Sequence, residues 1–300
     1  MRTRAIVFLM LAAAAAIVFN KSIAAAEEAT VPQLTPNRLC STGDSMTEAI
    51  YAELPLANHW ASWVNGYHGF WQDLLGLTDV KSHSQRIEKA FGKKGKKNFM
   101  AAKSGADSFD FADQARKAVQ NKATYVTVLM GHNDVCQHDF LKQPTADEFR
   151  NNMNAGFRLL AAGLPAGATI YVVGMVDIYE LWLLGEEKKA LGIIDCELLW
   201  TTTLFDLFPC TTVLSPSIAE EERLASRALN AAYNDELEKL VTAYSQNDPR
   251  HYWIYTDTVF NYGPAPASFV SDIDCFHPSA RGQKELSRIT WQAGPFGPSK

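Results

Sequence analysis

The sequence lacks the features of several large classes of protein. It carries no excess of positive charge, since 28 Lys and Arg stand against 33 Asp and Glu, which gives a formal charge of −5. It contains no internal repeat, no low-complexity tract and only one long apolar run, which lies at the N-terminus. These absences argue against a nucleic-acid-binding protein, a repeat protein and a membrane protein with several spans.

Cysteine is also scarce, and the spacing of the cysteines does not resemble a zinc site. An odd number cannot all pair within one chain, so at least one free thiol is expected. Closeness in sequence favours a local disulfide between Cys196 and Cys210. Cys275 could pair with Cys136 or remain a packed thiol, and the sequence does not decide between these. The five cysteines are Cys40, Cys136, Cys196, Cys210 and Cys275.

The N-terminus has the layout of a secretory signal peptide. Arg2 and Arg4 make a basic start, an apolar run extends from Ala5 to about Phe19, and small residues precede a predicted cleavage site after Ala26. The alternative is an uncleaved membrane anchor, but the run is short for a span. Cleavage would leave 25 Lys and Arg against 33 Asp and Glu, a charge of −8. We therefore predict a secreted or periplasmic protein with no stable transmembrane segment and no nucleic-acid partner.

The remaining length fits one α/β domain of roughly 250 residues. Residues 27–36 are expected to form an extended lead-in, and residues 37–300 a single domain. Two stretches of this domain, near 50–96 and 178–214, are rich in aromatic residues and leucine. We predict that they are lid-like insertions, although core packing is the simpler explanation for most of their aromatic side chains.

Short β-like runs alternate with helical patterns along the domain. The run at 123–130 is apolar through most of its length, as a buried parallel strand requires. Strands that alternate with helices predict an α/β fold with a parallel sheet covered on both faces. Strands are expected at 38–42, 97–103, 123–130, 168–176 and 252–256, and helices near 109–121, 145–163 and 216–245, with Ser215-Pro216 opening the last helix.

Four polar motifs fall at the carboxyl ends of predicted strands. In a parallel sheet these ends meet at one edge, where binding and catalytic sites form. All four motifs could therefore contribute to a single site. They are Gly43-Asp44-Ser45, Ser104-Gly105-Ala106, Gly131-His132-Asn133-Asp134 and Asp274-Cys275-Phe276-His277-Pro278.

Three of these side chains match the needs of nucleophilic catalysis. A serine hydroxyl is a poor nucleophile that needs a base within hydrogen-bond reach. His277 can act as that base for Ser45, and Asp274, three residues before it, can orient the imidazole. Asp272 is an alternative acid. Ser45 could also be only a helix N-cap, which is a common role for serine.

Acyl transfer also needs preorganised donors for the oxyanion of its tetrahedral intermediate. The Ser45 backbone amide is one candidate, the Gly105 amide is a second, because glycine permits close backbone approach, and the Asn133 side-chain amide is a third. Gly105 could instead serve only as a turn residue, and Asn133 as a turn cap. Asp134 is expected to cap a turn rather than take part in chemistry.

Together these blocks resemble the signature of the SGNH (GDSL-type) hydrolase superfamily. Ser45, Gly105, Asn133 and His277 occur in the order of that family, and the resemblance extends over residues 40–280. The strings YVTVLMGHNDVC and DCFHPSARGQ also resemble those of secreted bacterial esterases or lipases and phospholipase-B-like members. The resemblance implies a flavodoxin-like, three-layer α/β/α sandwich around a five-stranded parallel sheet. It also implies hydrolysis of carboxylic esters with no metal and no cofactor.

We therefore predict a serine esterase or lipase with Ser45, Asp274 and His277 as catalytic residues and Ser45, Gly105 and Asn133 as oxyanion donors. Its partner would be a small-molecule or lipid ester. The same site could serve an acyltransferase or a carbohydrate deacetylase, and a non-catalytic module that binds lipid or glycan is a further alternative. The chain does not fit an α/β-hydrolase, because no Gly-x-Ser-x-Gly motif occurs.

Other polar residues near these motifs have simpler explanations. His132 is interpreted as a variable loop residue, and a contact to the acyl or leaving group is the alternative. His132, His138 and Asp139 do not make a complete set of metal ligands. Tyr179 and Trp182, after the fourth predicted strand, are weak candidates for contact with a substrate.

Overall fold

The computed structural model describes residues 31–201 and 210–297. The chain divides into two units, Met1–Pro32 and Gln33–Lys300, and the second holds every strand of the described residues. The predicted signal peptide lies outside the described residues. Within the described ranges, no helix is both long enough and apolar enough to cross a membrane.

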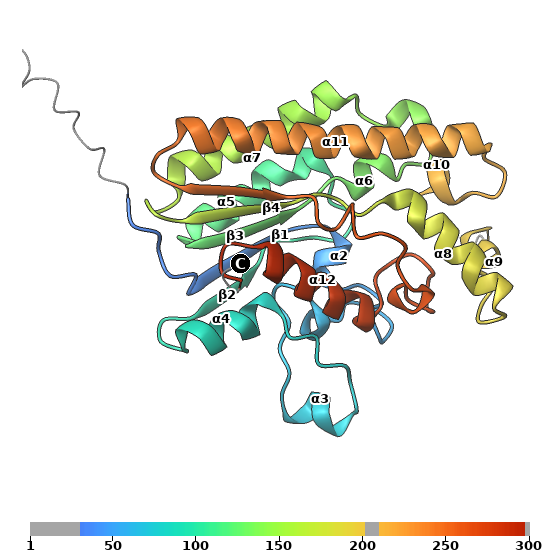
Figure 1. The fold of residues 1–300 in the computed structure, drawn as a ribbon, viewed down its shortest axis with the longest axis horizontal. Coiled ribbons are helices and arrows are strands. Elements are labelled where there is room, and N and C mark those ends of the chain that lie inside the picture. The colour runs from blue at the N-terminus through green and yellow to red at the C-terminus, as the bar shows by residue number, and fades with distance from the viewer. Residues whose placement is uncertain (1–30, 202–209, 298–300) are drawn as a thin grey trace, which may run out of the picture. The chain divides into compact units, whose positions relative to one another are not determined.

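A five-stranded parallel sheet forms the centre of the second unit (Figure 1). The strand order is β2-β1-β3-β4-β5, so the chain adds β2 on one side of β1 and the later strands on the other. In such a sheet the site is expected outside the carboxyl ends of β1 and β3, where the order switches. β3 and β4 are buried along their whole length, as both faces of a parallel sheet require. The strands are β1 (Arg38–Gly43), β2 (Lys97–Met100), β3 (Tyr125–Leu129), β4 (Thr169–Val173) and β5 (Tyr252–Thr256).

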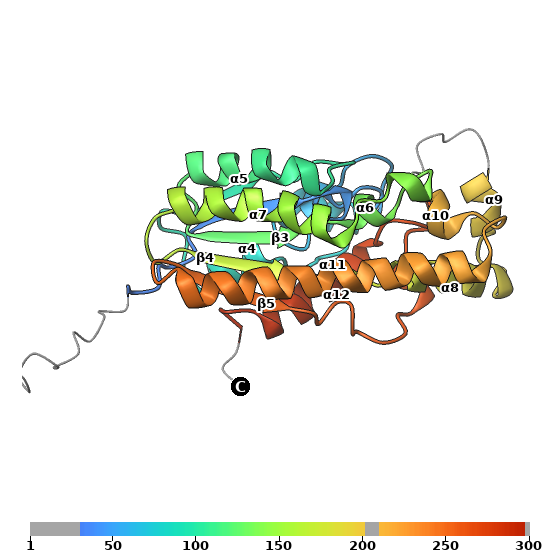
Figure 2. The same ribbon diagram turned by 90° about the horizontal axis from the view of Figure 1, so that it is seen from above.

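Helices cover both faces of this sheet, which confirms the predicted α/β/α architecture. Figures 1 and 2 show α5 (Phe111–Gln120), α7 (Ala146–Gly163) and α11 (Glu220–Asn247) side by side on one face. α4 (His83–Phe91) and α12 (Ala280–Ala293) lie on the other. Alternate residues of each strand supply the two cores: in β4, for example, Ile170 and Val172 pack with the first helix layer, and Tyr171 and Val173 with the second.

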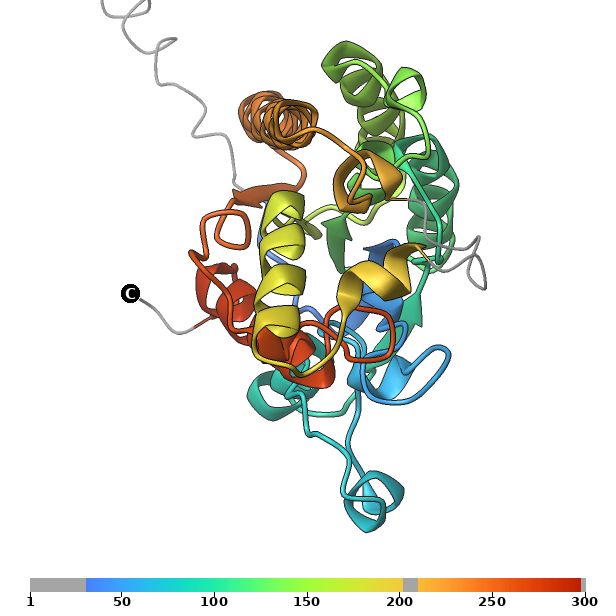
Figure 3. The same cartoon turned by 90° about the vertical axis from the view of Figure 1, so that its right-hand side faces the viewer.

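Most of the remaining elements lie around the carboxyl ends of the strands. Seen from that end, α8 crosses in front of the sheet (Figure 3). α3 stands away from the body in Figure 1 and exposes Phe70, Trp71 and Leu74. These elements are α2 (Ser45–Glu48), η1 (His59–Ala61), α3 (Phe70–Leu74), η2 (Ser108–Asp110), α6 (His132–Val135), η3 (Phe140–Lys142), α8 (Ile178–Ala190), α9 (Cys196–Thr201), α10 (Thr211–Leu214) and η5 (Ala267–Phe269).

The last long helix begins later than the sequence predicts. α11 starts at Glu220 and not at Ser215-Pro216, because the Ser215 carbonyl accepts the Ile218 N–H at 3.2 Å and closes a separate turn. The Ala219 N–H then donates to the Glu222 carboxylate at 3.1 Å, which satisfies a backbone donor where the helix begins.

Both disulfide pairings suggested by the sequence are wrong. Cys136, which directly follows α6, is bonded to Cys210, and Cys196, which opens α9, is bonded to Cys275. The pairs join segments 74 and 79 residues apart, so closeness in sequence was a poor guide to closeness in space. Cys40 is the free thiol, and its burial in the sheet raises its pKa to about 12.

Candidate active site

The first motif forms the turn that leaves β1. Gly43 has φ +147°, and a Cβ there would lie 2.5 Å from the Leu129 carbonyl oxygen, so this position requires glycine. Asp44 is the N-cap of α2, because its side chain accepts the Met46 N–H at 2.9 Å. The interpretation of Ser45 as the N-cap is therefore wrong.

The Ser45 hydroxyl instead ends a chain of buried hydrogen bonds. Ser45 Oγ lies 2.7 Å from His277 Nε2, and His277 Nδ1 lies 2.5 Å from Asp274 Oδ2. Since a carboxylate only accepts, Nδ1 carries the proton and Nε2 is left to accept the hydroxyl proton. The structure thus brings together three predicted residues from opposite ends of the chain.

The loop before α12 fixes which aspartate faces His277. Asp274 is 2 % exposed, and its Oδ1 accepts the backbone N–H of His277 at 3.1 Å. Asp272 turns away and binds Lys188 Nζ at 2.5 Å, with 69 % of its side chain exposed. The geometry therefore favours Asp274 over the alternative acid.

Two links anchor this loop to the α8–α9 segment. Cys275, between Asp274 and Phe276, forms the disulfide with Cys196. The buried Lys188 of α8 donates to the Val270 carbonyl at 2.7 Å. The segment that carries the acid and the base is therefore held by one contact from α8 and one from α9.

Gly105 and Asn133 lie near the site in different ways. Asn133 lines the same cavity as Ser45, and its Nδ2 donates to the Ala106 carbonyl at 2.8 Å, which joins the second and third motifs. Gly105 has φ +77° in the turn after β2 and does not line the cavity, although a Cβ there would meet no atom within 4 Å. Their roles as oxyanion donors stay predictions.

His132 is not the variable loop residue that the sequence suggested. It is 4 % exposed, its Nδ1 lies 2.7 Å from Asp44 Oδ2, and its Nε2 accepts the Val176 N–H at 3.2 Å. The interpretation failed because its partners come from two other strand ends, which no local pattern reveals.

Two buried glutamines also hold the turn that carries Ser45, and sequence reasoning missed both of them. Gln114 of α5 accepts the Gly43 N–H at 2.7 Å and donates to the Gly43 carbonyl at 2.8 Å. Gln283 of α12 donates to the Met46 carbonyl at 2.7 Å and accepts the Trp63 N–H at 3.0 Å. The sequence of a helix does not reveal which loop a glutamine side chain will bind, because that depends on how the helix packs.

Asp134 supports a neighbouring turn, close to the expected role. Its carboxylate accepts the Ser108 N–H at 2.8 Å and the Ser108 hydroxyl at 2.6 Å. Burial raises the pKa of Asp134 to about 7, and the charges of Asp107 and Asp44 add to the effect.

An apolar cavity of about 140 Å³ opens beside Ser45. Its walls come from α8, from the segment 259–270 and from α12. Glu180 lines it as well, and burial raises the pKa of that carboxyl. Other lining residues are Val176, Ile178, Leu181, Leu184, Val259, Tyr262, Phe269, Val270, Phe276, Leu286 and Ile289.

The weaker candidates lie outside this lining. The Tyr179 hydroxyl donates to Glu220 at 2.5 Å, and the Trp182 ring lies 3.8 Å beneath the Arg223 guanidinium. Asp139 caps η3 through the Leu141 N–H at 2.9 Å. Within the described residues, no group of three or more His, Cys, Asp or Glu side chains is placed to hold a metal ion.

Solved structures with a similar fold come from several bacteria. A protein from Parabacteroides merdae described as a GDSL-like lipase shares 13 % identity, with 88 % of this chain and 98 % of that chain covered and a TM-score of 0.52. An acetyl xylan esterase from Geobacillus stearothermophilus shares 15 % identity, with 90 % of this chain and 99 % of that chain covered and a TM-score of 0.48. An extracellular lipase from Streptomyces rimosus shares 14 % identity, with 85 % of this chain and 99 % of that chain covered and a TM-score of 0.48. Among curated protein sequences none matches the chain.

The family model for GDSL-like lipase/acylhydrolase matches residues 42–289. This match spans most of the chain and includes every motif at the carboxyl edge of the sheet, from Ser45 to His277. The chain therefore belongs to the GDSL-like lipase/acylhydrolase family and is a carboxylic ester hydrolase of that family.

Proposed function

We propose that the protein hydrolyses esters of apolar carboxylic acids, with Ser45 as nucleophile, His277 as base and Asp274 as the acid that orients it. The buried chain of hydrogen bonds from Asp274 through His277 to the Ser45 hydroxyl carries this proposal. That chain gives the hydroxyl a base within reach and fixes the imidazole in the tautomer that can accept its proton.

In the first half of the reaction Ser45 Oγ attacks the ester carbonyl, and its proton passes to His277 Nε2. The tetrahedral oxyanion takes hydrogen bonds from the amides of Ser45 and Gly105 and from the Asn133 side chain. The carbon–oxygen bond to the alcohol then breaks, and the alcohol leaves with the proton from His277. An acyl group remains on Ser45.

In the second half water replaces the alcohol. His277 takes a proton from water as the new oxygen attacks the acyl carbon. The bond to Ser45 Oγ then breaks, and the proton returns to that oxygen. The free acid is released, and the hydrogen-bonded chain is restored.

The cavity supports an apolar acyl group as part of the substrate. Most of its lining residues are aliphatic or aromatic, Asp177, Glu180 and Glu285 add carboxyl groups, and it opens directly beside Ser45. Burial of an acyl chain there would contribute about 0.8 kcal/mol for each methylene group. We infer that the 178–201 segment acts as a wall, or lid, of this pocket, whereas no residue of 50–96 lines it.

We also infer export, as the sequence predicts. Two disulfides within the described structure support this, because such bonds persist in oxidising compartments.

The proposal is tested by initial rates on p-nitrophenyl esters from acetate to palmitate, with the wild type beside Ser45→Ala. The expected result is activity that disappears in Ser45→Ala and persists in Ser217→Ala, which alters an exposed serine at the entrance to α11. Equal activity in wild type and Ser45→Ala would refute the assignment of the nucleophile.

A further inference from the structure

The proposed mechanism leaves one buried histidine–aspartate pair unused. The His132 and Asp44 side chains are 4 % and 1 % exposed, and Nδ1 lies 2.7 Å from Oδ2. Asp44 directly precedes Ser45, and His132 directly precedes Asn133. The pair therefore joins the residue before the proposed nucleophile to the residue before a proposed oxyanion donor.

Hydrogen bonding fixes the protonation state of His132. Its Nε2 faces the backbone N–H of Val176 at 3.2 Å, and an N–H can only donate. Nε2 must therefore present its lone pair, and the single ring proton lies on Nδ1, where it is donated to Asp44. A neutral His132 thus bridges the ends of β1, β3 and β4, and Val176 at the third of these lines the cavity.

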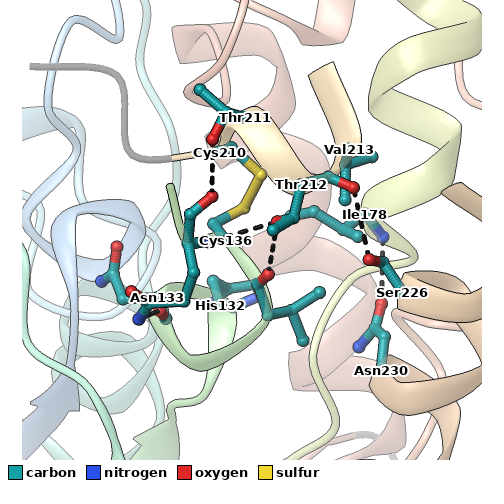
Figure 4. Close-up of a disulfide and its surroundings, with 12 residues drawn as sticks. His132, Asn133, Cys136, Ile178, Cys210, Thr211, Thr212, Val213, Ser226 and Asn230 are labelled. Atoms are coloured by element: carbon teal, nitrogen blue, oxygen red, sulfur yellow. Dashed lines mark hydrogen bonds between the residues drawn. A yellow bond between two sulfur atoms is a disulfide. The ribbon is translucent and has the colours of Figure 1, made fainter. Parts of the chain in front are cut away.

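The turn that carries Asn133 is anchored at its other end as well. Figure 4 shows His132 and Asn133 on the turn that leads to Cys136, which is bonded to Cys210. Thr212 Oγ donates to the Val135 carbonyl at 2.9 Å on the same side. The disulfide anchors the turn after Asn133. The start of the turn, before Asn133, is held by His132.

From these contacts we propose that His132 is a positioning residue. This inference rests on the proposed function. It holds the Asn133 amide and the Ser45 turn in the relative positions that the transition state needs, and it transfers no proton. A shift of about 1 Å in such a group can lower the rate on the order of 10²-fold. The loss should appear in kcat and leave KM nearly unchanged, because the oxyanion exists only after substrate is bound.

The test compares three substitutions by kcat and KM on a p-nitrophenyl ester that the wild type hydrolyses. His132→Leu removes both hydrogen bonds and should lower kcat on the order of 10²-fold. His132→Asn can still donate to Asp44, and His132→Gln can still accept from Val176. Because the bond to the carboxylate is charge-assisted, we expect His132→Asn to recover most of kcat.

A matched control separates positioning from stability. His251 is buried and its Nδ1 lies 2.7 Å from Asp248 Oδ2, so it forms a histidine–aspartate pair of the same length, but it precedes β5 at the opposite end of the sheet. His251→Leu should lower the melting temperature and leave kcat per folded molecule unchanged.

Asp44→Asn provides a second route if His132→Leu does not fold. The asparagine keeps the cap on Met46 but can turn its NH2 group toward His132, which would force the other tautomer and break the bond to Val176. A fall in kcat at constant KM is expected here too. Unchanged kcat in every folded variant of His132 and Asp44 would overturn the inference, whereas activity retained in Ser45→Ala would instead reject the proposed function.

Discussion

Asn133 shows what a single side chain contributes at the residue scale. Its amide nitrogen donates one hydrogen to the Ala106 carbonyl and carries a second hydrogen, and the side chain lines the cavity beside Ser45. If that hydrogen binds the oxyanion, Asn133→Ala should lower kcat about 10²–10³-fold with little change in KM. Steady-state kinetics on a p-nitrophenyl ester measure this.

A nearby asparagine serves as the control. Asn152 Nδ2 donates to Ser108 Oγ at 3.0 Å in an adjoining turn but does not line the cavity, so Asn152→Ala should keep kcat within a few-fold. Wild-type kcat in Asn133→Ala would remove the side chain from the mechanism.

Asp134 predicts a specific pH dependence of stability. Its ordinary pKa is 3.8, and its folded pKa is about 7, so between these values the folded state holds a proton that the unfolded state has lost. The contribution of Asp134 to the free energy of unfolding should therefore fall as pH rises from about 4 to about 7. Its size is up to about 4 kcal/mol, because each pKa unit corresponds to 1.36 kcal/mol.

Urea denaturation of the wild type and Asp134→Asn across this range measures the effect. The stability of the variant relative to the wild type should rise with pH, because asparagine is neutral throughout. A difference that is independent of pH, or that falls, would contradict the assigned direction of the pKa shift.

At the scale of elements, α8 presents two leucines to different surroundings. Leu184 lines the cavity and is 6 % exposed, whereas Leu183 does not line it and is 41 % exposed. Leu184→Trp should shorten the acyl chain that the enzyme prefers. The ratio of kcat/KM for the decanoate ester to kcat/KM for the acetate ester should fall by about 10–200-fold, which is the discrimination typical of one methylene group in an apolar pocket.

Leu183→Trp is the matched control, since it adds the same bulk on the solvent side of the same helix. Chain-length profiles of kcat/KM for the two variants and the wild type decide the matter. A Leu184→Trp profile that overlays the wild type would mean that the acyl chain lies elsewhere.

At the scale of the whole molecule, the two disulfides join the residue after α6 and the first residue of α9 to segments that are distant in sequence. Replacing Cys196 and Cys275 together by alanine should lower the free energy of unfolding by about 2–5 kcal/mol, because the unfolded chain regains the freedom of a long loop. Thermal unfolding of this variant beside the wild type measures the loss.

Peptide mapping under non-reducing conditions checks the pairing that this prediction assumes. Linked peptides should contain Cys136 with Cys210 and Cys196 with Cys275. A peptide that links Cys196 to Cys210 would show that the bonds follow sequence distance after all.

The sequence by itself determined the strands and the motifs that follow them. The run at 123–130 predicted β3 because a strand buried on both faces must be apolar throughout, and this property is local. Alternation of strands with helices then required a parallel sheet, whose carboxyl ends meet at one edge. That topology assigned Ser45 to this edge, whereas Asp274 and His277, which lie well beyond the end of β5, were assigned by their acid–base spacing and by the family resemblance.

The tertiary structure alone decided which residues meet across that edge. The disulfide pairs, the contacts of His132 with Asp44 and Val176, and the clamp of Gln114 on Gly43 all join segments that are far apart in sequence. Such contacts depend on how helices pack over the sheet and how loops turn at its edge. Hydrophobic periodicity fixes which face of a helix is buried, but it does not specify which buried polar group finds which partner.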